Sequence, residues 1–130
     1  MKKLILLFFL PLLSLAQLEV VTNGFSPEAP LSLSYYSELH TRDIHLIEST
    51  FFKYGIHIQT GSDSYNIVDF NIVYNGFHPE VDNIYGKISY AGTIVATFSF
   101  INPRSNGKYT YTKKQMINAI VTELSNTEEL

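Results

Sequence analysis

The sequence contains no cysteine, and only 16% of its 130 residues are charged. Without cysteine the chain forms no disulfide, no thiolate nucleophile and no cysteine-ligated metal site. Its stability must therefore come from a hydrophobic core. The nine phenylalanines and nine tyrosines supply large apolar area for that core, and a chain of this length buries enough surface to build one.

Motifs that carry common enzyme chemistry are also missing. The sequence has no H-E-x-x-H, G-x-S-x-G, G-x-G-x-x-G or P-loop pattern. His40 and His45 are five residues apart, about 140° around a helix, so they do not chelate one ion from a single face. Four acids fall in or near predicted loops or strand ends: Asp63, Asp69, Glu80 and Asp82. Their spacing does not require any two of them to converge, and we predict no enzyme, no metal and no cofactor.

The N-terminus carries the chain's longest hydrophobic run. Two lysines precede an apolar stretch over residues 4–13, and the small residues Ser14 and Ala16 follow it. This pattern predicts a signal peptide over residues 1–16 that is cleaved after Ala16. The stretch is shorter than the roughly 20 residues that span a bilayer. We expect a mature periplasmic or secreted protein that starts at Gln17, with no stable membrane insertion.

The charge balance narrows the class of partner. Cleavage would remove two lysines and no acid, so the net charge would change from −3 to −5. Nucleic-acid binding depends on phosphate neutralisation by Lys and Arg, and an acidic chain argues against it. The mature sequence also lacks a polybasic patch for anionic lipid.

Residues 17–125 are predicted to form one α+β domain, followed by a frayed tail over residues 126–130. A first short strand over 17–24 ends at an Asn-Gly turn signal. The segment that follows contains Pro27 and Pro30 and is predicted to be an extended loop.

Two helices are predicted from caps and apolar stripes. The first runs from the N-cap Thr41 to Gly55, with Asp43 in the first turn where the helix dipole favours an anion. Alternatively, "SYYSEL" (34–39) extends this helix backwards by a turn. Its stripe is Ile44, Ile47, Phe51 and Tyr54. The second begins with a T-x-x-Q capping box at Thr112 and Gln115. Its core-facing residues are Met116, Ile117, Ile120, Val121 and Leu124.

Alternation of apolar and polar residues predicts the strands. In "NIVDFNIVY" (66–74), Phe70 falls on one face and Asp69 on the other, which explains the acid without catalysis. A short strand is predicted in "GIHIQTG" (55–61), and a hairpin is predicted to turn at Ala91-Gly92. The two arms of this hairpin place Ile84, Ile88 and Tyr90 on one face, and Ile94, Ala96, Phe98 and Phe100 on one face.

Consecutive strands with short links favour a four- or five-stranded, mainly antiparallel sheet. Two one-sided helices would cover one face of it, giving a two-layer sandwich. The hairpin over residues 84–101 contains no proline, and Lys87 is its only Lys or Arg. Sheet edges without such protection favour strand addition by a protein partner, or a homo-oligomer formed by strand-edge pairing.

The segment before the last helix holds the candidate binding residues. Tyr109 and Tyr111 alternate, so both rings would lie on one side and could stack on a sugar or a peptide proline. Arg104 and Lys108 would add a cationic corner, together with the lysines at the start of the helix. A solvated loop explains the same charges. An enzyme would instead require a deep pocket where His57 and Asp69 converge.

The element order resembles that of small envelope proteins of Gram-negative bacteria. "TFSFINPR" (97–104) is similar to the hairpin end of the curli-secretion accessory (CsgE-like) family, where an x-P-R segment precedes the final helix. This resemblance spans about residues 41–125, and "FFKYG" (51–55) matches only part of the family's aromatic helix signature. "VDFNIVY" (68–74) is similar to a strand of periplasmic lipoprotein domains of unknown function, whose lipobox cysteine is missing here.

The first resemblance implies a non-enzymatic periplasmic adaptor that binds an export channel or its substrate. Together with the unprotected edges, it leads us to expect an exported protein-binding module, an accessory or adaptor in envelope assembly or secretion. The alternative is a small-molecule or glycan-binding periplasmic domain that uses Tyr109 and Tyr111.

Overall fold

The structure is a computed structural model that describes residues 17–34, 39–60, 65–76 and 80–126. The predicted signal peptide and the last four residues of the predicted tail lie outside the described residues. Within the described part of the chain, no helix is both long and apolar enough to cross a membrane.

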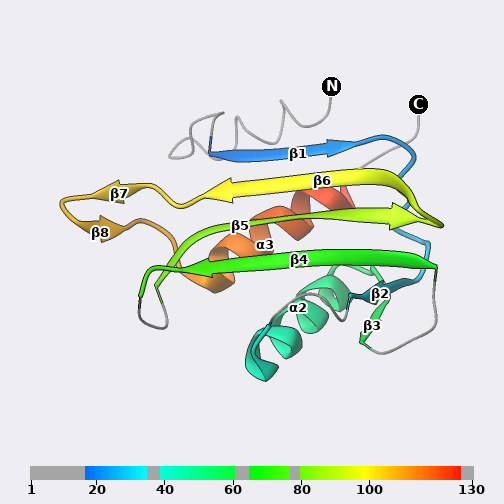
Figure 1. Cartoon of the computed structure of the whole chain (residues 1–130), viewed down its shortest axis with the longest axis horizontal. Helices are drawn as coiled ribbons and strands as arrows, with labels where there is room; N and C mark the ends of the chain where they lie inside the picture. Colours follow the sequence, from blue (N-terminus) through cyan, green and yellow to red (C-terminus); the bar gives the residue numbers. More distant parts are fainter. Residues whose placement is uncertain (1–16, 35–38, 61–64, 77–79, 127–130) are drawn as a thin grey trace.

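A six-stranded sheet forms the centre of the molecule, in the order β1-β6-β5-β4-β2-β3 (Figure 1). Its strands are β1 (Leu18–Thr22), β2 (Leu31–Leu33), β3 (Ile58–Thr60), β4 (Asn66–Tyr74), β5 (Val81–Tyr90) and β6 (Thr93–Ile101). The helices are α2 (Thr41–Lys53) and α3 (Lys113–Ser125), and β7 (Arg104–Ser105) pairs with β8 (Lys108–Tyr109) in a separate small sheet. The α+β class and the mainly antiparallel sheet are confirmed, but the predicted number of four or five strands is wrong.

The missing strand is β2, in a segment predicted to be a loop. It has only three residues, too few to show a period of two, and it begins directly after Pro30. β2 pairs in parallel with both β3 and β4. A parallel pair needs a crossover connection, and α2 supplies it between β2 and β3.

The helix α3 follows its sequence signals closely. The Thr112 side chain accepts a hydrogen bond from the Gln115 amide, and the Gln115 side chain accepts one from the Thr112 amide, as the capping box predicts. All five predicted core residues are buried: Met116, Ile117, Ile120, Val121 and Leu124. The helix that carries them packs against β1, β5 and β6.

The helix α2 differs from the prediction at its start. Its N-cap is His40, which makes no side-chain cap bond, so the predicted N-cap Thr41 is wrong by one residue. The end is as predicted, since Gly55 follows the C-cap with a φ of 81°. Ile47 and Phe51 are fully buried, and the other two stripe residues, Ile44 and Tyr54, are half-buried.

The hairpin of β5 and β6 turns at Ala91-Gly92, as predicted, with positive φ at both residues. A β-bulge lies just beyond the turn, where Ile88 pairs with Ala96 but Ser89 pairs with Ile94. The extra residue changes which side chains face the core. Val95 is buried and Ile94 is 51% exposed, so the prediction that Ile94 shares a face with Phe98 is wrong.

The two arms of this hairpin are interior strands, not sheet edges. β6 is covered by β1, and β5 is covered by β4. The low charge of the hairpin therefore reflects its central position. The edges of the described sheet are β1 and β3.

The sheet has one face toward the helices and one face that no described helix covers, which is turned to the viewer in Figure 1. We call the second one the open face. Strand register places six large, exposed apolar side chains on it. They are Val21, Ile67, Val73, Tyr85, Ile94 and Ile101, each 39% to 53% exposed.

Candidate functional site

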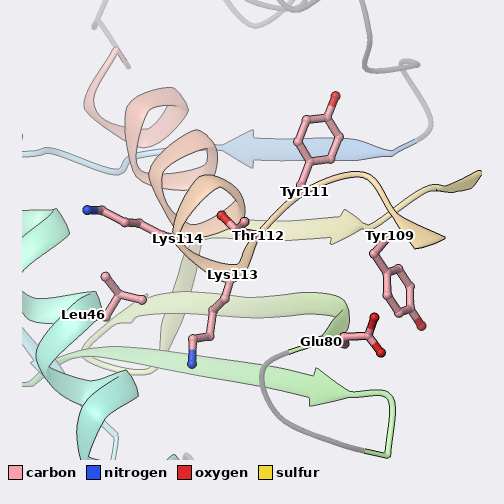
Figure 2. A pocket seen from close by; sticks show the side chains of 7 residues that line it. All are labelled: Leu46, Glu80, Tyr109, Tyr111, Thr112, Lys113 and Lys114. Carbon is pink, nitrogen blue, oxygen red and sulfur yellow. The ribbon is translucent and has the colours of Figure 1, made fainter.

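A hollow of about 340 Å³ opens beside the start of α3 (Figure 2). Its lining comes from α2, from the residue before β5, from β8 and from the first turn of α3. The lining residues are Leu46, Glu80, Tyr109, Tyr111, Thr112, Lys113 and Lys114. A volume of this size falls at the lower end of the range for small-molecule sites.

Tyr109 is held from two sides. Its hydroxyl donates a hydrogen bond of 3.0 Å to Asp82 Oδ1, and the Arg104 guanidinium lies 4.8 Å from the centre of its ring. Arg104 and Tyr109 are direct partners in the β7–β8 pair. Desolvation is the main cause that raises the pKa of Tyr109, and the bond to Asp82 raises it further. Tyr109 is therefore a neutral, positioned donor and not an acid that ionises near neutral pH.

Tyr111 is held through its backbone by a buried side chain, that of Asn102. The Asn102 amide nitrogen donates to the Tyr111 carbonyl at 2.8 Å, and its oxygen accepts from the Tyr111 N–H at 3.0 Å. The same nitrogen donates to the Val81 carbonyl at 2.9 Å. The Tyr111 ring meets Phe100 edge to face, with 5.6 Å between ring centres. The segment that leads into α3 is thus tied to the ends of β5 and β6.

Lys113 connects the hollow to a buried polar cluster. Its ammonium lies 2.5 Å from Asp43 Oδ1 and 3.2 Å from the Tyr74 hydroxyl. Tyr74 donates a second, short hydrogen bond to Asp43. Asp43 is fully buried. Burial first, and then the bond to Asp43, raises the pKa of Tyr74 well above its usual value.

This cluster leaves Lys114 as the exposed ammonium of the hollow. The Lys113 ammonium is occupied by Asp43, while Lys114 is exposed and lines the same space. Glu80, also exposed, supplies a carboxylate. The hollow therefore offers one exposed cation, one exposed anion and the two tyrosines to a ligand.

The predicted binding residues are only partly brought together. Tyr109 and Tyr111 both line the hollow, but Figure 2 shows their side chains pointing to different sides of the segment that joins them. Arg104 lies against Tyr109 without lining the hollow, and Lys108 is an exposed residue of β8 that does not line it either. The segment predicted to be a polar loop is in part the small β7–β8 sheet, which turns at Asn106-Gly107 with positive φ at both residues.

Sequence reasoning missed Asp43, Tyr74 and Asn102 as organising residues. A weak signal was present for Asp43, which precedes Ile47 by four residues and so shares its buried helix face. Asn102 had no such signal, because its three bonds go to Val81 and Tyr111, 21 and 9 residues away, and no helical or strand period connects these positions.

Among the residues that the structure describes, the histidines and the remaining acids do not assemble into a reactive group, and Asp63 lies outside those residues. Asp69 pairs directly across from Lys87 on the open face, as its alternation with Phe70 predicts. His57 is exposed before β3, and neither it nor Asp69 lines the hollow. His45 and Glu48 share one face of α2, 3.9 Å apart. Among the described residues, no group of three His, Asp or Glu side chains could hold a metal ion.

Comparison of the chain with protein-family models, with curated proteins and with solved structures gave no match. The function of this chain must therefore be argued from its own surfaces.

Proposed function

We propose that this chain is an exported, non-enzymatic protein-binding module, an accessory or adaptor in envelope assembly or secretion. The observation that carries the proposal is the open face. Eight large apolar side chains are exposed among the described residues, and six of them lie on this one surface. Apolar side chains gathered on one surface are typical of interaction sites, whereas scattered ones are not.

The charges on the open face fit a protein partner better than nucleic acid or lipid. Asp69 and Lys87 face each other across β4 and β5, and the other charged residues of β1, β4, β5 and β6 are two acids, Glu19 and Asp82. A phosphate backbone or an anionic membrane would need several unpaired cations. The proposal treats the domain as a two-layer sandwich with helices on one sheet face and the partner on the other.

Site-specific photo-cross-linking in cells tests the proposal. A photoreactive amino acid placed at Tyr85 or at Ile101 should give the same discrete adduct with an envelope protein. Both side chains are about half exposed, so the replacement leaves the core intact. The matched control is Phe52, an apolar residue of α2 that is 77% exposed but lies off the open face. An adduct at Phe52 as strong as that at Tyr85, or none at either open-face position, would refute the proposal.

Export itself is tested by the mass of the protein recovered from the envelope fraction. We expect a chain that begins at Gln17, with or without cyclisation of that residue. A chain that keeps residues 1–16 would contradict the predicted cleavage.

A second candidate is the binding of a small molecule or a glycan in the hollow. The observation that favours it is that Tyr109, Tyr111, Glu80 and Lys114 all line the same hollow. Titration calorimetry with neutral and acidic sugars should then detect binding that Tyr109→Ala weakens by roughly tenfold or more, as loss of a stacking ring does. The control Tyr65→Ala removes a tyrosine that is 81% exposed outside the hollow. Equal affinity of both variants for every sugar would remove this candidate.

A further inference from the structure

We propose that β1 pairs in antiparallel orientation with β1 of a second copy of this chain, about a two-fold axis at Val20. The two six-stranded sheets would then form one continuous sheet. This inference goes beyond the proposed function, because the dimer would form whether or not a partner occupies the open face.

The first observation is that alternate residues of β1 direct their main-chain hydrogen-bonding groups toward β6 and away from it. Ile101 donates to the Gln17 carbonyl, and Asn23 donates to the Val95 carbonyl. In the register of β1 with β6, odd-numbered residues of β1 are therefore the bonded ones. The N–H and C=O groups of Leu18 and Val20 point to the other side, where no described strand lies.

This edge lacks the usual protection against strand addition. β1 has five residues, no proline and a single charged residue, Glu19. The opposite edge, β3, has three residues and pairs in parallel with β2. A short edge strand is one of the ways in which native proteins avoid edge-to-edge pairing, so β3 is protected and β1 is not.

The single charge of β1 is compatible with pairing to a second copy and disfavours one of the alternative registers. With Val20 opposite the partner's Val20, the two residues exchange two main-chain hydrogen bonds. Glu19 then lies opposite the partner's Val21, in a non-bonded pair where side chains approach most closely. A register shifted by one pair would place Glu19 opposite the partner's Glu19, and like charges directly opposite are unfavourable. The register centred on Val20 thus avoids the like-charge contact that a register centred on Glu19 would create.

The two faces of the sheet match across the same axis. A two-fold axis perpendicular to the sheet keeps the helices of both copies on one side and both open faces on the other. Leu18 and Val20 are buried under α3, which packs on β1. Pairing would continue this row of buried side chains from one copy of the chain into the other. Val21, 53% exposed on the open face, would gain the partner's Glu19 as its neighbour.

A charge-swap series on exported, purified protein tests the dimer by sedimentation velocity over a wide range of concentrations. Val21→Glu should weaken the dimer by roughly tenfold or more, because the new carboxylate faces the partner's Glu19 and symmetry repeats the contact twice. Val21→Lys should strengthen it by a similar factor. The double change Glu19→Lys/Val21→Glu places opposite charges face to face again, and should reverse the loss caused by Val21→Glu and give a dimer at least as strong as the wild type. All three substitutions are on the open face, and circular dichroism checks that the fold is retained.

A disulfide provides a second readout, since the chain has no cysteine of its own. Non-bonded antiparallel pairs bring Cα atoms about 4.5 Å apart, within the range that a disulfide bridges. Glu19→Cys/Val21→Cys should therefore give a covalent dimer on oxidation. The control Tyr85→Cys/Lys87→Cys has the same spacing on the interior strand β5 and should remain a single chain.

Wild-type protein that sediments as a monomer throughout, or a dimer that is indifferent to the charge at position 21, would overturn the inference. Neither result bears on the cross-links from Tyr85, so the two proposals fail separately.

Discussion

Asp43 and Lys113, 70 positions apart in the sequence, form a buried ion pair of 2.5 Å between the first turns of α2 and α3. The Asp43 and Lys113 side chains are 1% and 12% exposed. Tyr74, at the end of β4, donates to the same carboxylate and accepts from the same ammonium. The starts of both helices are thereby fixed to the sheet directly beside the hollow.

Lys113→Met should lower the free energy of unfolding by about 3–5 kcal/mol, because it leaves the buried Asp43 carboxylate without its ammonium. Urea denaturation measures the change. The control is Lys114→Met at the next, exposed position, where we expect less than about 0.5 kcal/mol. The double variant Asp43→Leu/Lys113→Met should be more stable than Lys113→Met alone, since it leaves neither partner of the pair buried without the other. Equal losses for the two single lysine variants would show that the pair contributes nothing measurable.

Tyr74 makes the stability of the fold sensitive to alkaline pH. Its pKa in the folded protein is raised, chiefly by burial and then by the bond to Asp43. Ionised Tyr74 therefore favours the unfolded chain, whose tyrosines titrate near pH 10. The stabilisation is fully present below that pH and is lost as the pH rises above it.

The measurement compares wild type with Tyr74→Phe by urea denaturation between about pH 8 and about pH 11. Wild type should lose more stability over this interval than Tyr74→Phe, in which the group that ionises is absent. Parallel curves would contradict the assignment.

Features of the fold were predictable from the sequence when the interacting residues lie close together in the chain. The capping box of α3 and its core stripe depend on residues within a few turns, and both are confirmed. The strand β2 and the hydrogen bond from the Asn102 side chain to the Val81 carbonyl depend on partners distant in the sequence, and both were missed. Ile94 shows a third case, in which alternation was read correctly but one extra residue in the strand reversed its outcome.

The candidate site divides in the same way. Tyr109 and Tyr111 were recognisable as a pair from their spacing, and the structure does place both at the hollow. The prediction that both rings lie on one side is wrong, because Asp82 holds one ring while Asn102 and Phe100 hold the other residue. The residues that fix the tyrosines come from β5, from β6 and from the position that follows β6. No local sequence pattern connects them to the tyrosines.

Asn102→Ala should cost about 2–4 kcal/mol of stability. The substitution removes the donor for the Val81 and Tyr111 carbonyls and the acceptor for the Tyr111 amide, in a position that is 3% exposed. Thermal unfolding gives the overall effect, and faster hydrogen exchange at the Tyr111 amide shows that the clamp itself has opened. Asn71→Ala, at an exposed side-chain bond of 3.4 Å, serves as the control with little expected loss. An unchanged exchange rate at Tyr111 would contradict the role given to Asn102.

A substitution at Gly86 tests how closely β4 and β5 approach each other next to the aromatic side chains of the core. A Cβ at this position would lie 2.0 Å from the Asp69 carbonyl oxygen and 2.6 Å from the Phe98 ring. The carbonyl belongs to the backbone of the neighbouring strand, so it cannot rotate away as a flexible side chain would. Gly86→Ala should therefore destabilise the protein by about 1–3 kcal/mol or more, the usual cost of overpacking.

Ser89→Ala, three residues along the same strand, introduces no new atom and should change stability by less than about 0.5 kcal/mol. The comparison also bears on the open face, because separating β4 from β5 would displace Asp69 from Lys87. A Gly86→Ala protein that unfolds at the same urea concentration as Ser89→Ala would mean that the two strands lie further apart than the structure places them.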